Sequence, residues 1–264
     1  MKKFLKSFYG LLMTFGFDPL KSFRALRGLP IYLVNFAKYM RQWNASKVVF
    51  GNLRIFPCLD DRYSESGSVK GHYFHQDLLV ARKIHENRPS LHVDVGSRVD
   101  GFIAHVAAFR KINVLDIRKM VAKIPNISFI QCDIMGDLPE TLIDSCDSLS
   151  CLHALEHFGL GRYGDPVRYD GHLIGFRNLH KMLRPGGKMY LSVPIGPQRV
   201  EYDAHRVFSV RYIIDLVSEW FRIDVFSYVN DAGDLHEDVP LLDKDIATNF
   251  GCRYGCGIFE LSKL

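Results

Sequence analysis

The segment best suited to bind a ligand is a turn rich in glycine and charge, from Asp94 to Gly101. A short apolar run at 91–93 precedes the turn, and residues 102–110 after it have the pattern of a helix. A second apolar run, 112–115, ends at Asp116. Strand, glycine turn, helix, strand and acid, in that order, are typical of a nucleotide-binding βαβ unit, in which the acid binds two ribose hydroxyls.

The residues of the turn indicate which nucleotide it binds. A dinucleotide site needs the pattern GxGxxG, which seats the pyrophosphate on a helix N-terminus. Here Arg98 and Asp100 stand between Gly96 and Gly101, so that pattern is absent. A carboxylate at the end of the first strand, Asp94, suits a ligand with an amino group and a positive charge, and S-adenosylmethionine is such a ligand. The alternative is a βαβ turn that binds nothing.

The carboxyl ends of four apolar runs are expected to meet at one crevice, because ligands of parallel sheets bind there. Asp133 follows the third run, and its carboxylate suits the exocyclic amine of adenine. The alternative for Asp133 is a loop cap over Ile134. The residues expected to bind the cofactor are Asp94, Gly96, Ser97, Asp116, Ile117, Asp133 and Ile134.

Three groups that could bind a metal or move a proton follow the fourth run, in the string His153-Ala-Leu-Glu156-His157. This string matches the inverted zinc-protease motif HxxEH. We reject that interpretation because glycines follow at 158–161, so the long helix of such a protease is absent. Glu156 and His157 remain candidate ligands for a divalent cation, and the histidines are candidate general bases. A structural role in the core is the alternative.

Two further segments are expected at the same end of the sheet. The glycine-punctuated loop 159–166 carries Arg162, Tyr163 and Asp165, which could bind a polar substrate, or it could be a simple connection. His205 follows the next loop and is another candidate base, with a surface ion pair as the alternative.

Strands that alternate with helices from residue 91 onward predict an α/β fold. We expect a doubly wound, mostly parallel sheet with helices on both faces and an N-terminal helical extension. Strands are expected at residues 91–95, 112–116, 127–131, 147–152, 187–193, 222–228 and 257–262, and helices at 72–86, 100–110, 171–183 and 209–219.

The composition, with 47% hydrophobic and 24% charged residues among 264, is ordinary for a globular protein. We expect two parts, a basic helical extension at 1–70 and the α/β domain at 71–264. The six cysteines lack paired CxxC spacing, and neither Cys252 nor Cys256 has a second pair or a histidine close by in the sequence. Reduced thiols in a cytoplasmic protein are therefore expected.

Positive charge is concentrated near the N-terminus. Residues 1–47 hold nine lysines and arginines against one acid, Asp18, a balance of +8 within a total of +5. Helices are expected up to about residue 45, with breaks at Pro19 and Pro30. The first helix is basic and amphipathic, and it is too short and too charged to span a bilayer. It could pack on its own domain, lie on an anionic membrane or form an oligomer contact. Its apolar stripe consists of Phe4, Leu5, Phe8, Leu11, Leu12 and Phe15.

Together these motifs resemble a class I S-adenosylmethionine-dependent methyltransferase, which has a Rossmann-like fold. The string at 94–97 resembles the first motif of that superfamily, Asp116 its ribose-binding acid and Asp133 its adenine-side acid. The turn LRPGGK at 183–188 resembles the turn before its fifth strand.

The chain resembles more closely the uncharacterised family known as domain of unknown function 268. The strings that carry the resemblance are HYFHQD at 72–77, DVGSRVDGF at 94–102, LDIR at 115–118, DSLSCLHALEHFGLGRYGDP at 147–166, RPGGKMYLSVPIG at 184–196 and AHRVFS at 204–209. The segment around Glu156 is also similar to the metal-binding ExxEH segment of ubiquinone-pathway O-methyltransferases, with His153 in place of the first acid.

The sequence therefore predicts an enzyme that transfers a methyl group from S-adenosylmethionine to an oxygen of a small or glycan-like acceptor in surface polysaccharide biosynthesis. His153, Glu156, His157 and His205 are the expected catalytic residues. We expect no nucleic-acid partner, and peripheral contact with anionic membrane through the N-terminus. The alternative function is a non-catalytic binding module recruited to a membrane or an enzyme complex.

Overall fold

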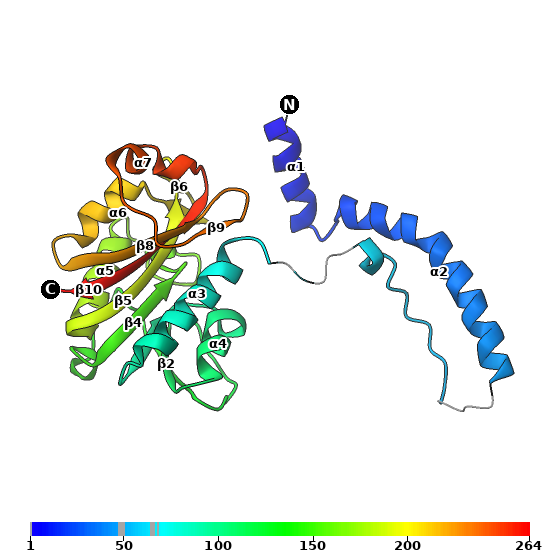
Figure 1. The fold of residues 1–264 in the computed structure, drawn as a ribbon, viewed down its shortest axis with the longest axis horizontal. Coiled ribbons are helices and arrows are strands. Elements are labelled where there is room, and N and C mark those ends of the chain that lie inside the picture. The colour runs from blue at the N-terminus through cyan, green and yellow to red at the C-terminus, as the bar shows by residue number, and fades with distance from the viewer. Residues whose placement is uncertain (1, 47–50, 64–66, 68) are drawn as a thin grey trace. The chain divides into compact units, whose positions relative to one another are not determined.

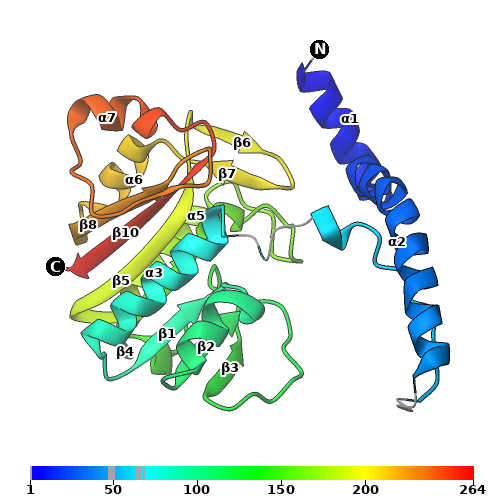
Figure 2. The ribbon, with the colours of Figure 1, turned by 45° about the vertical axis from the view of Figure 1, so that its right-hand side comes forward.

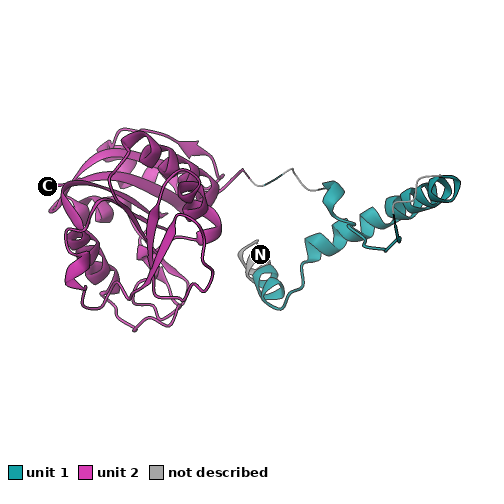
Figure 3. Cartoon of the chain, turned by 90° about the horizontal axis from the view of Figure 1, so that it is seen from below, with its two compact units in different colours: residues 1–68 teal, residues 69–264 magenta. Residues whose placement is uncertain are grey.

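The computed structural model describes residues 2–46, 51–63, 67 and 69–264, with the backbone alone for residues 2–7. The chain divides into two compact units, residues 1–68 and 69–264 (Figure 3). The sequence had placed this boundary at residue 70.

The first unit consists mainly of two helices, α1 (Lys2–Thr14) and α2 (Pro19–Ala45). Asp18 caps α2, because its carboxylate accepts hydrogen bonds from the backbone N–H groups of Leu20 and Lys21, both at 3.0 Å. The expected break at Pro30 is wrong, since α2 continues through it. A proline removes one backbone hydrogen bond, and the other turns of a 27-residue helix compensate for that loss. No helix among the described residues is long and apolar enough to cross a membrane.

Residues 47–57 were expected to form a strand or an extended segment. Residues 47–50 lie outside the described part, and 51–57 form no regular element. A single turn of 3₁₀ helix follows at Asp61–Tyr63.

The second unit is built on one eight-stranded sheet in the order β3-β2-β1-β4-β5-β10-β8-β9 (Figure 1). Neighbouring strands are parallel in the first part of this order, which runs from β3 through β2, β1 and β4 to β5. Beyond β5, the strands β10, β8 and β9 each pair with their neighbours antiparallel. The expected mostly parallel α/β sheet is thus confirmed. The strands are β1 (His92–Val95), β2 (Ile112–Asp116), β3 (Ile127–Gln131), β4 (Cys146–Leu152), β5 (Leu183–Ile195), β8 (Phe221–Val229), β9 (Leu235–His236) and β10 (Gly255–Lys263).

Helices cover both faces of the sheet. On one face α3 and α4 pack through residues such as Ile84 and Val106, and on the other α5 and α6 pack through residues such as Phe176 and Ile213. Figure 2 shows α3 running along the face formed by β4 and β5. Because both faces are covered, the central strands β1 and β4 are almost entirely buried, including polar residues such as His92, Asp94 and Ser150. The helices are α3 (His72–Asn87), α4 (Ala104–Ala107), α5 (Gly171–Met182), α6 (Val210–Val217) and α7 (Asp243–Ala247).

Several elements differ from the expectation. The helix expected at 100–110 is replaced by an irregular turn, Val99–Ile103, followed by the short α4, because Gly101 has a non-helical backbone. The hairpin of β6 (Arg199–Glu201) and β7 (His205–Val207) was not predicted, and neither were β9 and α7. These elements are too short to show a hydrophobic period.

Candidate functional site

A pocket of about 550 Å³ lies at the edge of the sheet where β1, β2 and β4 end. A volume of this size suits a small-molecule ligand, and the crevice beyond the strand ends is where such sheets bind ligands. The residues predicted from the sequence that line it are Gly96, Ser97, Asp116, Ile117, Ile134, His153, His157, Arg162, Tyr163 and Asp165.

The glycine turn forms one wall of the pocket. Gly96 has a φ of +78°, in the left-handed region that favours glycine. A Cβ at this position would also lie 2.8 Å from the Cβ of Ala154, which is on the opposite side of the turn. Gly96 N–H donates to the carbonyl of Leu115 at 2.9 Å, which fixes the turn against the end of β2.

Asp94 lies beneath this turn and not on the pocket wall. Its carboxylate accepts hydrogen bonds from Ser97 N (3.1 Å), Ser97 Oγ (2.7 Å) and Ser150 Oγ (2.5 Å). Complete burial raises the pKa of Asp94 to about 7, and the bonds from Ser150 and Ser97 oppose that rise. Asp94 therefore shapes the turn, and it can reach a ligand only through Ser97. Ser150, in the middle of β4, was not predicted from the sequence.

Asp116 ends β2 beside this turn and lines the pocket, as expected, but its carboxylate is already engaged. Arg118 binds it through Nε to Oδ1 at 2.9 Å and Nη2 to Oδ2 at 2.5 Å. The Arg118 guanidinium also lies 4.7 Å from the ring centre of Tyr163, across the pocket mouth. Arg118 lies in the LDIR string and lines the pocket, although sequence reasoning gave it no role.

Asp133 is placed differently from Asp116. Its Oδ1 accepts a hydrogen bond from Met135 N at 2.9 Å, as in the loop cap considered as an alternative. Asp133 is not among the residues that line the pocket, whereas its neighbour Ile134 is.

His153 and Glu156 form a buried pair at the base of the pocket. His153 has a left-handed backbone, with a φ of +49°, and its Nδ1 lies 2.7 Å from Glu156 Oε1. Burial raises the pKa of Glu156, but attraction to His153 and the hydrogen bond with it more than offset this, so the pKa lies below its ordinary value. Glu156 is therefore a buried carboxylate. The segment is a single 3₁₀ turn, Leu155–His157, so the rejection of a zinc-protease helix is confirmed.

His157 faces the pocket with one nitrogen free to accept a proton. Its Nδ1 donates to the carbonyl of Ala204 at 2.8 Å, which leaves the lone pair on Nε2. Burial lowers the pKa of His157, and the ring is therefore neutral near pH 7. Glu156 Oε1 lies 3.8 Å from Nε2, close enough to stabilise a positive charge on the ring.

The loop 159–166 is organised around Asp165. Its carboxylate accepts from the backbone N–H groups of Gly159 (2.9 Å), Gly161 (3.2 Å) and Tyr163 (3.1 Å). Most of its hydrogen-bonding capacity is thus used within the loop. Arg162 and Tyr163 remain the side chains best placed to bind a substrate.

Arg206, a buried residue of β7, holds the start of this loop. Its guanidinium donates to the carbonyls of Phe158 (2.6 Å) and Tyr169 (3.1 Å). Its neighbour His205 does not line the pocket. His205 Nε2 lies 3.3 Å from Glu201 Oε2, but burial lowers the pKa of His205, so this contact is an ion pair only when the ring is protonated. Sequence reasoning chose His205 and overlooked Arg206.

A family model described as Caenorhabditis protein of unknown function, DUF268, matches residues 106–239. Among curated proteins no sequence relative was found.

Two of the solved structures that match this chain illustrate the shared fold. One is Burkholderia thailandensis 1,6-didemethyltoxoflavin-N1-methyltransferase with bound 1,6-didemethyltoxoflavin and S-adenosylhomocysteine, at 12% identity and a TM-score of 0.50 over 89% of this chain and 90% of that chain. The other is an O-methyltransferase from a trans-AT PKS multienzyme of Brevibacillus brevis in complex with S-adenosylhomocysteine, at 18% identity and a TM-score of 0.50 over 72% of this chain and 71% of that chain. At these identities the likeness shows a methyltransferase-like Rossmann fold.

Proposed function

We propose that this chain, which belongs to the DUF268 family, is an S-adenosylmethionine-dependent methyltransferase. The observation that carries the proposal is the pocket at the carboxyl edge of the sheet, lined by the Gly96 turn after β1 and by Asp116 at the end of the adjacent β2. A glycine turn and a strand-end acid on adjacent parallel strands suit a nucleoside whose ribose binds the acid. Two proteins of the same fold were solved with S-adenosylhomocysteine bound, which supports this choice of cofactor.

In this proposal the turn of Gly96 and Ser97 holds the methionine end of the cofactor, and Asp116 accepts hydrogen bonds from the ribose hydroxyls. The Arg118 side chain, which is about half exposed, has to swing away from Asp116 when the ribose binds. The apolar residues Ile117 and Ile134 then flank the adenine.

The proposed reaction needs an acceptor oxygen in line with the methyl group and a group that takes its proton. His157 Nε2 is the best-placed base, because its lone pair is free and it lines the pocket. S-adenosylmethionine would supply the methyl group to the acceptor oxygen, and His157 would take the proton that this oxygen loses. The products are a methyl ether and S-adenosylhomocysteine. Glu156 stabilises the charged His157 ring.

Titration with S-adenosylhomocysteine tests the cofactor assignment directly. We expect Asp116→Ala to weaken the affinity by at least about 10- to 100-fold, because the loss of even one charged hydrogen bond costs roughly 1.5–3 kcal/mol. Asp215→Ala, which removes an exposed acid on α6, is the matched control and should bind like the wild type. Calorimetry provides the affinities. If the wild type gives no heat at millimolar ligand, the non-catalytic binding module becomes the better hypothesis.

We propose further that the first unit binds anionic membrane at its surface and that the acceptor is a glycan met there. Large apolar side chains of this unit stand in solvent: Phe15 is 81% exposed and Leu26 is 70% exposed. Exposed apolar side chains close to basic ones suit the interface of an anionic bilayer. This proposal also motivates the assignment to surface polysaccharide biosynthesis, since a lipid-linked glycan lies at that interface.

Liposome co-sedimentation of the full-length protein tests the membrane proposal. We expect it to sediment with anionic vesicles at low salt and to stay in solution with neutral vesicles. The double variant Lys38→Glu, Arg41→Glu should bind more weakly, because each basic residue near such a surface contributes about 1 kcal/mol. Both of these residues are exposed. A wild-type protein that remains in the supernatant with anionic vesicles contradicts the proposal and removes the main support for a glycan acceptor.

A further inference from the structure

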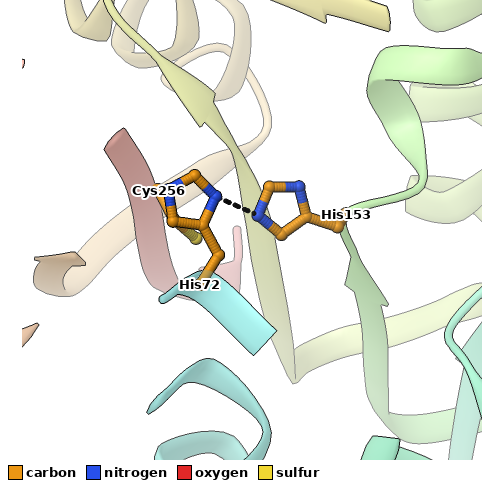
Figure 4. Close-up of side chains that lie close together, drawn as sticks. All are labelled: His72, His153 and Cys256. Carbon is orange, nitrogen blue, oxygen red and sulfur yellow. Dashed lines mark hydrogen bonds between the residues drawn. The ribbon is translucent and has the colours of Figure 1, made fainter. Parts of the chain in front are cut away.

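Three side chains suited to bind a metal meet beside the pocket. They are His72 at the first position of α3, His153 after β4, and Cys256 near the start of β10 (Figure 4). One ligand atom from each lies within 4.8 Å of the other two. His72 Nδ1 and His153 Nε2 are 3.1 Å apart.

The topology of the sheet brings these residues together. Strand β4 is parallel to β5, with Leu152 opposite Ser192, whereas β10 is antiparallel to β5, with Cys256 opposite Pro194. The end of β4 and the start of β10 therefore lie at the same edge. No histidine is near Cys256 along the chain, and from this the sequence predicted no zinc site. In the structure that expectation is wrong, because the fold brings His72 and His153 close to Cys256.

Glu156 orients the His153 ring for metal binding. Its Oε1 lies 2.7 Å from His153 Nδ1, so Nδ1 carries a hydrogen, and Nε2 faces His72 Nδ1, where a cation would replace the hydrogen that the two rings share. A carboxylate that holds the far nitrogen of a histidine in this way is the usual second partner of a metal-binding imidazole. The other carboxylate oxygen, Oε2, is buried without a hydrogen-bond partner among the described residues. A cation bound nearby would stabilise the negative charge of this carboxylate.

The spacing of the ligand atoms fits a small tetrahedral ion. Two imidazole nitrogens bound to zinc at about 2.0–2.1 Å are roughly 3.4 Å apart in tetrahedral geometry. The separation of 3.1 Å between His72 Nδ1 and His153 Nε2 is close to that value. Cys256 is fully buried, and its sulfur lies 3.7 Å from Gln76 Oε1 and 3.9 Å from the carbonyl oxygen of Gly257.

Aromatic rings flank the cluster. The Tyr254 ring lies 5.3 Å from the His72 ring, and the Tyr73 ring lies 5.2 Å from the His153 ring, measured between centres. Two of the three ligands, His153 and Cys256, are buried, and burial strengthens the interaction between a cation and its ligands. His153 and Tyr73 also line the pocket, so the cluster adjoins it.

We propose that His72, His153 and Cys256 bind one divalent cation of the zinc class, with Glu156 as the positioning residue. Two imidazole nitrogens and a thiolate suit a borderline-soft ion such as Zn²⁺ better than Mg²⁺ or Ca²⁺. Three protein ligands leave a fourth position for water or for an oxygen of a bound molecule. His153 is then a ligand, and His157 remains the base of the proposed reaction. The metal site does not depend on the cofactor assignment.

Cobalt binding tests the site on the full-length protein, reduced with a phosphine and stripped of metal by a chelator. We expect a sulfur-to-cobalt charge-transfer band that saturates at one Co²⁺ per chain and is abolished by added Zn²⁺. Cys256→Ser should lose the band, and His72→Gln should weaken cobalt binding about 100-fold or more. Glu156→Gln keeps the shape of the side chain and removes its charge, so it should weaken binding about 10- to 100-fold without changing the thermal melt.

Cys252→Ser is the matched control, because Cys252 is also buried, belongs to the same segment and lies outside the cluster. It should retain the band in full, and circular dichroism should show that every variant is folded. A folded wild type without the band at saturating cobalt overturns the site, and so does an equal loss in Cys252→Ser. S-adenosylhomocysteine affinity measured on the same samples separates this outcome from a failure of the methyltransferase proposal.

Discussion

Raising the pH from 5 to 8 is expected to lower the free energy of unfolding of the wild type relative to Asp94→Asn by roughly 2–3 kcal/mol. The cause is the buried carboxyl of Asp94, whose pKa burial raises to about 7 from an ordinary value of 3.8. A raised pKa in the folded state means that the stabilising contribution is complete below the unfolded pKa and is lost as pH rises toward the folded pKa. Urea denaturation at several pH values measures the difference.

Asp147→Asn is the control for this experiment. Burial raises the pKa of Asp147, but hydrogen bonds from the backbone N–H groups of Leu91 and Ser90 more than offset it, so the pKa is lowered. Asp147 is therefore fully ionised in both states from pH 5 to 8, and its variant should differ from the wild type by a constant amount. Parallel pH curves for the wild type and Asp94→Asn would show that Asp94 is ionised throughout.

Gly96→Ala is expected to weaken S-adenosylhomocysteine binding at least tenfold and to lower the free energy of unfolding by about 2–5 kcal/mol. Its left-handed φ of +78° costs an L-residue about 1–2 kcal/mol. The new methyl group would also lie 2.8 Å from the Cβ of Ala154, and overpacking of this kind typically costs about 1–3 kcal/mol. The turn must then move away from Ala154, and this movement changes the shape of the pocket wall. Urea denaturation and calorimetry measure the two effects.

Gly186→Ala is the control that separates the cost of backbone strain from the cost of steric contact. Gly186 has a similar φ of +73°, but a Cβ there would meet nothing within 4 Å, and it does not line the pocket. This variant should lose about 1–2 kcal/mol of stability and retain full affinity for the ligand. Equal losses of affinity in both variants would contradict a role for Gly96 in the site.

The parallel half of the fold could be predicted from the sequence, because β1, β2, β3 and β4 each contain apolar residues and are bounded by turn residues. The strands at 221–229 and 255–263 were also predicted, but their antiparallel direction was not, since pairing partners are not encoded in a local pattern. The β6–β7 hairpin has strands of three residues each, which are too short for alternation to be visible.

Residues of the candidate site could be predicted from the sequence where the course of the backbone alone places them at the pocket. Gly96 and Asp116 line the pocket because the carboxyl ends of parallel strands share an edge. Asp94 and Asp133 do not line it, because the direction of a side chain at a strand end depends on its hydrogen bonds to neighbours such as Ser150 and Met135.

The cluster of His72, His153 and Cys256 could not be predicted from local spacing, although the signal was partly visible. His72 opens the HYFHQD string, which was noticed as a family feature and given no role. Its contact with His153 joins residues 81 positions apart, and long-range packing alone decides such a contact.

Because β10 lies between β5 and β8, the sheet cannot be completed until the C-terminal segment has been synthesised. Strand β5 ends at Ile195, and its antiparallel partner begins at Gly255, so the ribosome must synthesise residues 196–254 before that partner exists. Until then a long apolar strand in the middle of the future sheet has one open edge, which can pair with another chain. Closure of the sheet is thus a late, long-range step in folding, and the nascent protein is most exposed to aggregation just before it.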